Sequence, residues 1–180
     1  EAMLAAQEGI PMAVIDEAAL AFGMPQGPIE LADTVGLDVA YHVGQVLSQA
    51  FGTPAPDALK PMLDAKKLGR KTGEGFYRWV DGKPQRPSAG DTRPPEDLQD
   101  RLVLPMLNEA VAVLREGIVA DEELLDAGAI FGTGFAPFRG GPLHYARRRG
   151  VANVVARLRE LEARHGARFR PDDGWSRLEV

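Results

Sequence analysis

An internal repeat is the feature that most constrains the fold of this chain. In each half, a helical stretch and a stop are followed by a second helix, a Gly-Pro dipeptide, a third helix and a closing glycine. The dipeptides are Gly27-Pro28 and Gly141-Pro142, and the closing glycines are Gly36 and Gly150. A few matching glycines could arise by chance, but chance does not readily give the same order of helices, stops and Gly-Pro dipeptide in both halves. We therefore predict two copies of one helical module, packed about a pseudo-twofold axis as a homodimer would be.

The spacing of apolar residues predicts an all-α fold, because it follows the period of a helix almost everywhere, and glycine or proline marks the helix ends. Only residues 75–80 could be extended, so a Rossmann or TIM architecture is excluded for these residues. The polar tail 167–180 is expected to be weakly structured. The expected helices are 1–9, 12–22, 29–35, 37–51, 57–66, 96–116, 122–131, 142–149 and 151–165. In the helix 37–51, the residues expected to face inward are Val39, Val43, Val46, Leu47 and Ala50.

The domain boundaries follow from composition. Residues 81–95 are a candidate linker, since six of the fifteen are glycine or proline and they offer almost nothing to bury. We expect a first module at 1–80, truncated at its N-terminus, and a second, degenerate module at 96–180. The chain begins in a helical composition without a capping residue, so we expect a segment of a longer protein.

Composition excludes several classes of function. The chain has no cysteine, which excludes disulfides and thiolate-bound zinc. The net charge of −5 has both signs interspersed, without the basic face of a nucleic-acid-binding protein. No apolar run approaches the length of a membrane span. His42, His144 and His165 lack the spacing of metal ligands, and the serines have no base nearby in sequence.

Three stretches resemble one enzyme family. Residues 23–38 (GMPQGPIELADTVGLD) and 69–77 (GRKTGEGFY) resemble the C-terminal domain of the 3-hydroxyacyl-CoA dehydrogenases. Residues 134–142 (GFAPFRGGP) resemble the second C-terminal repeat of the bacterial multifunctional α-subunit of fatty-acid β-oxidation. The resemblance extends from residue 1 to about residue 165. It implies the C-terminal, all-helical region of such an enzyme, in the cytoplasm.

The resemblance implies oxidation of an L-3-hydroxyacyl-CoA with transfer of hydride to NAD. It also implies an upstream Rossmann domain that binds NAD and carries a His–Glu pair, an upstream hydratase domain and a thiolase subunit as partners. A substrate-polarising asparagine would precede Glu1, and Asp100 holds its place in the second module. No G-x-G-x-x-G motif occurs, because Arg78 follows Gly73-Glu74-Gly75, and Pro137 follows Gly132-Thr133-Gly134, at the third glycine position. We therefore expect no catalytic residue, and no dehydrogenase activity, in the segment alone.

The glycine-rich loop 66–77 is the first candidate for substrate binding. Its glycines let a backbone approach a ligand, and its cations could meet phosphates. The alternative is a solvated basic turn with Phe76 and Tyr77 in the core. The residues concerned are Gly73, Gly75 and Phe76, with the cations Lys66, Lys67, Arg70 and Lys71.

Two further positions could contact substrate. Pro25 lies in a turn that could line an acyl cleft, although a simple helix-to-helix turn explains it equally. Phe131 aligns with an aromatic residue, often tyrosine, that touches substrate in multifunctional relatives, but its spacing is also typical of a core residue. Asp16 and Asp33 are expected to be surface charges or caps. A different function, a non-catalytic helical scaffold or dimerisation module, stays open.

Overall fold

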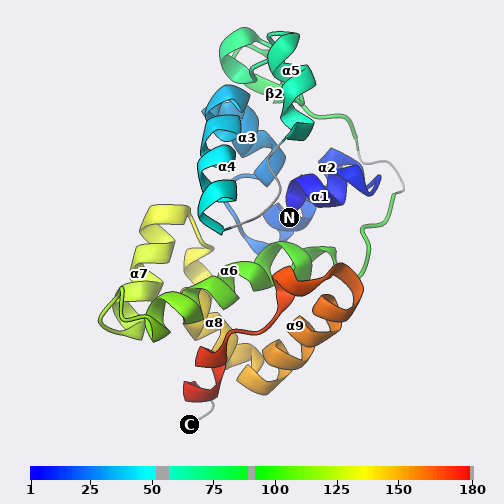
Figure 1. The fold of residues 1–180 in the computed structure, drawn as a ribbon. Coiled ribbons are helices and arrows are strands. Elements are labelled where there is room, and N and C mark those ends of the chain that lie inside the picture. Colours follow the sequence, from blue (N-terminus) through cyan, green and yellow to red (C-terminus); the bar gives the residue numbers. More distant parts are fainter. Residues whose placement is uncertain (52–56, 89–91, 179–180) are drawn as a thin grey trace. The chain divides into compact units, whose positions relative to one another are not determined.

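The computed structural model describes residues 1–51, 57–88 and 92–178, and these residues are mainly helical (Figure 1). The all-α prediction is therefore confirmed. Within these ranges no helix has both the length and the hydropathy that a membrane crossing requires. The α-helices are α1 (Ala2–Gln7), α2 (Met12–Phe22), α3 (Pro28–Val35), α4 (Leu37–Phe51), α5 (Lys60–Asp64), α6 (Leu98–Arg115), α7 (Glu122–Thr133), α8 (Pro142–Arg149) and α9 (Val151–His165). The short 3-10 helices are η1 (Asp57–Leu59), η2 (Arg70–Thr72), η3 (Pro137–Arg139), η4 (Ala167–Phe169) and η5 (Asp173–Arg177).

The chain forms two compact units. The N-terminal unit consists of Ala2–Glu17 and Gln26–Arg93, and the C-terminal unit consists of Glu1, Ala18–Pro25 and Pro94–Val180. The second half of α2 is therefore counted with the C-terminal unit. The predicted packing of the modules as a pseudo-dimer stays a prediction, as do the module boundaries.

The repeated order of elements is present in the structure. Helices α2, α3 and α4 recur as α7, α8 and α9, and α3 and α8 have eight residues each, whereas α4 and α9 have fifteen. Both eight-residue helices begin with Pro after a glycine and end at a glycine with positive φ, Gly36 at 107° and Gly150 at 92°. A positive φ is readily adopted only by glycine, which explains why the closing glycine occurs twice.

The core of the C-terminal unit is formed by the apolar faces of α6, α8 and α9 together with the end of α2. Phe22 packs edge to face against Phe135 and Tyr145, with ring centroids 5.5 and 5.2 Å away. Leu104 and Leu107 of α6 are fully buried in the same core.

The tail of the chain is ordered, and the expectation of a weakly structured tail is wrong. Phe169 and Trp175 are buried, and Trp175 donates its indole N–H to Oδ1 of Asn108 at 2.8 Å. Asp172 accepts two hydrogen bonds from Arg115. Short 3-10 turns lack helical periodicity, so the sequence pattern did not show that these aromatic residues pack onto α6 and α9.

The N-terminal unit contains a small β-hairpin, of which only the first strand lies in the stretch 75–80 that the sequence allowed to be extended. Strand β1 (Arg78–Val80) pairs antiparallel with β2 (Lys83–Gln85), and Trp79 faces Pro84. The second strand lies inside the predicted linker, so at least this part of the linker is structured. Three-residue strands are too short for a recognisable alternation.

Candidate functional site

A buried carboxylate organises the first module. Asp16 of α2 is inaccessible to solvent and accepts hydrogen bonds from the backbone N–H groups of Ile29 (2.8 Å) and Glu30 (3.1 Å), and from the hydroxyl of Tyr77 (2.9 Å). It therefore caps the N-terminus of α3 from a neighbouring helix, where the helix dipole favours a negative charge. Burial raises the pKa of Asp16 and outweighs these hydrogen bonds, which lower it.

Gly27 makes this arrangement possible. A Cβ atom at Gly27 would lie 2.2 Å from Cγ of Asp16, a distance at which one of the two groups must move. The φ of Gly27 is −72°, so the glycine provides space here and not an unusual backbone conformation. The Gly-Pro dipeptide of the sequence motif therefore keeps room for a buried cap.

The second module repeats the device. Asp126 of α7 accepts hydrogen bonds from the backbone N–H groups of Leu143 (2.7 Å) and His144 (2.9 Å) at the start of α8. A Cβ atom at Gly141 would lie 2.3 Å from Cβ of Asp126. Burial raises the pKa of Asp126 as it does that of Asp16. The paired carboxylates show that the two halves share a local packing plan as well as an order of helices.

A second buried carboxylate holds the loop 66–77. Asp33 of α3 is also inaccessible to solvent and accepts hydrogen bonds from the N–H groups of Phe76 and Tyr77 (2.8 Å each) and from the indole of Trp79 (3.0 Å). Neither Asp16 nor Asp33 is therefore a surface charge, whereas the alternative expectation of a cap agrees with Asp16. Sequence analysis also missed Asp126, although Asp126 and Asp16 are each the fifth residue of an expected helix, 122–131 and 12–22.

The loop presents fewer free groups to a ligand than its composition indicated. Lys71 pairs with Asp38 at 2.5 Å and Lys67 pairs with Glu74 at 2.6 Å. Gly75 is buried, and a Cβ there would lie 2.2 Å from Oδ1 of Asp33, so this glycine serves packing.

The remaining loop residues differ in exposure. Gly73 is exposed with open space at its Cβ position, Phe76 is half-buried, and Tyr77 is buried. The loop thus combines the two interpretations: its rear face is core, and its outer face is solvated and charged.

The two other predicted substrate residues lie in the C-terminal unit. Pro25 is exposed, and its ring lies close to Gly134. Phe131 is 89% exposed, so its interpretation as a core residue is wrong. An exposed phenylalanine at the end of α7 is available for contact with a ligand or another domain.

Asp100, at the position that the family resemblance assigns to an asparagine, is held by arginines. Its carboxylate accepts hydrogen bonds from Arg149 (2.6 and 3.0 Å) and Arg157 (2.8 Å). Burial raises the pKa of Asp100, but these hydrogen bonds outweigh burial and hold the pKa below its ordinary value. His165 is similarly bonded to Asp97 at 3.0 Å, as expected of a satisfied histidine.

One helix face is uncovered within its own unit. On α4, the side chains of Val39, Val43, Val46 and Leu47 are 43–52% exposed, so the expectation that they face inward is wrong. Leu31 and Val35 of α3 are equally exposed. The residues do share one face, as their spacing predicted; the spacing could not show that the described part of the chain leaves this face exposed.

The described residues provide positioning groups and apolar surfaces more than reactive chemistry. Their only sheet is the two-stranded hairpin, so they do not offer the parallel sheet and glycine-rich turn on which a Rossmann fold binds a dinucleotide. Among the residues whose placement is given, no group of three acidic or histidine side chains could hold a metal ion.

The sequence matches one family model over part of its length and curated relatives over nearly all of it. Residues 1–79 match the family described as 3-hydroxyacyl-CoA dehydrogenase, C-terminal domain. The chain is 37% identical over 189 residues to the fatty acid oxidation complex subunit alpha of Idiomarina loihiensis, which covers 93% of this chain and 27% of the relative. It is 38% identical over 186 residues to the corresponding subunit of Vibrio cholerae, covering 97% of this chain and 26% of the relative. The chain thus spans about a quarter of these curated relatives.

Two solved structures share the fold. The 3-hydroxybutyryl-CoA dehydrogenase of Escherichia coli K12 gives a TM-score of 0.77 at 20% identity, covering 99% of this chain and 56% of that one. The dehydrogenase part of multifunctional enzyme 1 from C. elegans gives 0.63 at 16% identity, covering 98% and 45%. With the repeated helical module and the capped Gly-Pro turns, the chain is thus similar to the 3-hydroxyacyl-CoA dehydrogenases, and its residues 1–79 match the model of their C-terminal domain.

Proposed function

We propose that this chain is the C-terminal helical part of an NAD-dependent L-3-hydroxyacyl-CoA dehydrogenase of fatty-acid β-oxidation. Its role is to dock an upstream Rossmann domain, which binds NAD, and to form one wall of the acyl-CoA cleft. In this oxidation the L-3-hydroxyacyl-CoA loses a hydride from its 3-carbon, which the nicotinamide accepts, and a proton from its 3-hydroxyl group. The match of residues 1–79 to the C-terminal domain of the 3-hydroxyacyl-CoA dehydrogenases supports this proposal.

The observation that carries the docking role is the uncovered apolar face of α4. Four aliphatic residues occur on it at helical spacing, and each is about half exposed within the N-terminal unit. Such a stripe is normally buried against another element. We propose that the Rossmann domain covers it in the full-length protein.

We propose the substrate contacts at the residues that the resemblance indicated. Lys71, Gly73 and Phe76 lie on the outer side of the loop 66–77, and Lys71 would exchange its exposed pairing with Asp38 for a phosphate of CoA. Pro25 and Phe131 expose apolar surface of the C-terminal unit toward an acyl chain. The relatives are named as subunits of a complex and are much longer than this chain, which supports the proposal of further domains and of a partner subunit. By the family resemblance, these would be upstream hydratase and dehydrogenase domains and a thiolase subunit, in the cytoplasm.

The test uses the chain joined to the upstream residues of its own reading frame. NAD reduction with L-3-hydroxybutyryl-CoA is measured for the parent protein and for a Val43→Glu, Val46→Glu variant. Two charges placed in a buried apolar interface would be costly, so kcat/KM should fall at least about tenfold, which corresponds to about 1.4 kcal/mol.

The control is Gln49→Glu, which adds one negative charge, half of that in the double variant, at an exposed position of α4 outside the stripe. It should leave kcat/KM within about twofold, as surface changes usually do. Equal activity of the control and the double variant would argue against docking at α4. NAD-dependent turnover by the 180-residue segment alone would contradict the proposal as a whole. It would also contradict the alternative of a non-catalytic scaffold.

A further inference from the structure

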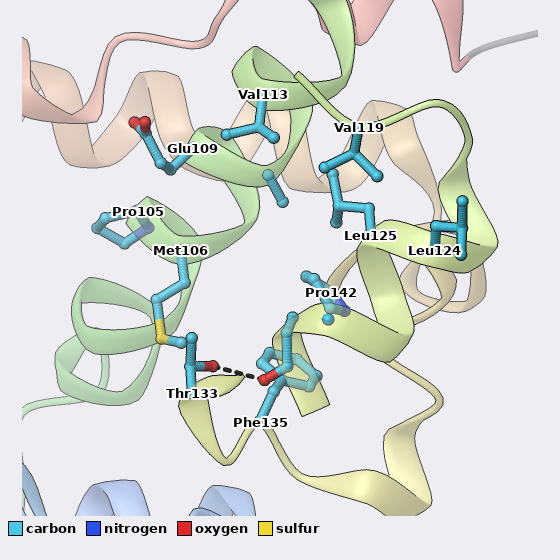
Figure 2. Close-up of a pocket in the computed structure, with 13 residues that line it drawn as sticks. Pro105, Met106, Glu109, Val113, Val119, Leu124, Leu125, Thr133, Phe135 and Pro142 are labelled. Atoms are coloured by element: carbon cyan, nitrogen blue, oxygen red, sulfur yellow. Dashed lines mark hydrogen bonds between the residues drawn. The ribbon is translucent and has the colours of Figure 1, made fainter. Parts of the chain in front are cut away.

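The C-terminal unit contains an apolar groove between α6 and α7 (Figure 2). Its volume is about 590 Å³, within the range of typical small-molecule sites. Met106 and Val113 line it from α6, Leu125 and Gly128 from α7, and Phe135 from the following loop. The remaining lining residues are Pro105, Glu109, Ala110, Val119, Leu124, Ala129, Thr133 and Pro142.

Gly128 enlarges this groove at a cost to the helix. It lies in the interior of α7, where glycine destabilises a helix relative to alanine. A Cβ atom at Gly128 would have no heavy atom within 4 Å, so neither packing nor backbone conformation requires glycine here. A residue that destabilises its helix, and that neither packing nor backbone conformation requires, is expected at a functional site.

The polar groups of the groove restrict what it can hold. Among the described lining residues only Glu109 is ionisable and none is cationic; Figure 2 shows its carboxylate directed away from Leu125 and Pro142. The hydroxyl of Thr133 donates to the carbonyl of Ala129 at 2.7 Å. The lining therefore offers no cation to a carboxylate or phosphate head group.

We propose that this groove binds a long aliphatic chain whose head group carries no negative charge. The apolar walls would bury the methylene groups, and the head group would remain near the exposed Glu109. This site is independent of the dehydrogenase assignment, because it lies in the described C-terminal unit alone.

The test uses the 180-residue chain and three probes with the same twelve-carbon tail, below their micelle concentrations: dodecyl maltoside, dodecyltrimethylammonium and dodecanoate. Titration calorimetry should give saturable, one-to-one binding of the neutral and cationic probes. Dodecanoate should bind at least about fivefold more weakly, because its charge is repelled by Glu109 and meets no cation. In a Glu109→Gln variant this difference should shrink.

Two glycine variants locate the site. Gly128→Leu would fill the groove and should weaken binding of dodecyl maltoside at least tenfold. Gly132→Leu is the matched control: Gly132 is also an exposed glycine of α7 with open space at its Cβ, but it does not line the groove. Circular dichroism verifies that both variants are folded.

The proposal is overturned if no probe binds saturably, if both glycine variants bind equally, or if dodecanoate binds as tightly as dodecyl maltoside. Self-association of the chain that Gly128→Leu abolishes, without probe binding, would also overturn it and assign the groove to a second copy.

Discussion

Replacing Gly27 with alanine should destabilise the N-terminal unit through one identifiable group, the carboxylate of Asp16. The new Cβ would lie 2.2 Å from Cγ and 2.3 Å from Oδ1 of Asp16. Because Asp16 is inaccessible to solvent and accepts three hydrogen bonds, moving it leaves buried donors without an acceptor. The backbone of Gly27, with φ at −72°, is itself compatible with alanine.

The magnitude follows from these contacts. Loss of a helix cap costs about 0.5–2 kcal/mol, and a buried donor left unsatisfied costs about 1–3 kcal/mol. Alanine recovers about 0.4–1 kcal/mol by restricting the unfolded chain. We therefore expect the free energy of unfolding to fall by about 2–4 kcal/mol in urea titrations followed by circular dichroism. Gly128→Ala, where the Cβ meets open space, should instead raise it by about 0.5–1 kcal/mol.

A double-mutant cycle tests the cause as well as the size. In an Asp16→Ala background the carboxylate is absent, so Gly27→Ala should then cost less than about 1 kcal/mol, and the two substitutions should couple strongly. The reasoning is refuted if Gly27→Ala is as stable as the parent chain, or if it costs the same in both backgrounds.

Two further predictions concern the C-terminal unit. Burial raises the pKa of Asp100, but Arg149 and Arg157 lower it more. The stability that Asp100 contributes is therefore present above the ordinary carboxyl pKa of about 4 and is lost as the pH falls through the lowered pKa. Asp100→Asn should reduce this loss of stability at acid pH in urea titrations across pH, and an unchanged profile would contradict the assignment. Trp175→Ala should lower the free energy of unfolding by about 3–5 kcal/mol, because the indole is buried and bonded to Asn108; an effect under about 1 kcal/mol would mean that the tail is not part of the core.

The sequence predicted the helices well because periodicity and glycine or proline stops act locally. The predicted spans 12–22, 37–51, 142–149 and 151–165 agree with α2, α4, α8 and α9. It predicted poorly whatever depends on a distant neighbour. Asp16 looks like a surface charge until the start of α3 and Tyr77 are placed against it.

The candidate site shows the same limit. The sequence identifies the loop 66–77 as a basic, glycine-rich segment, but it could not show that Asp38 and Glu74 already pair with two of its lysines. Phe131 has the spacing of a core residue and is nonetheless exposed, since periodicity indicates which residues share a face but not what covers that face.

The equivalent helices α4 and α9 carry the difference between the two modules. The apolar residues of α9, among them Val154, Leu158 and Leu161, are buried, because α6 and η4 pack against that helix. On α4 only Leu37 is buried among the side chains that the structure describes. Both modules keep the same buried cap at the Gly-Pro turn, which maintains the fold in each. The two copies therefore diverge in what covers these equivalent helices: α6 and the tail cover α9, whereas the exposed face of α4 is the surface to which our proposal assigns the Rossmann domain.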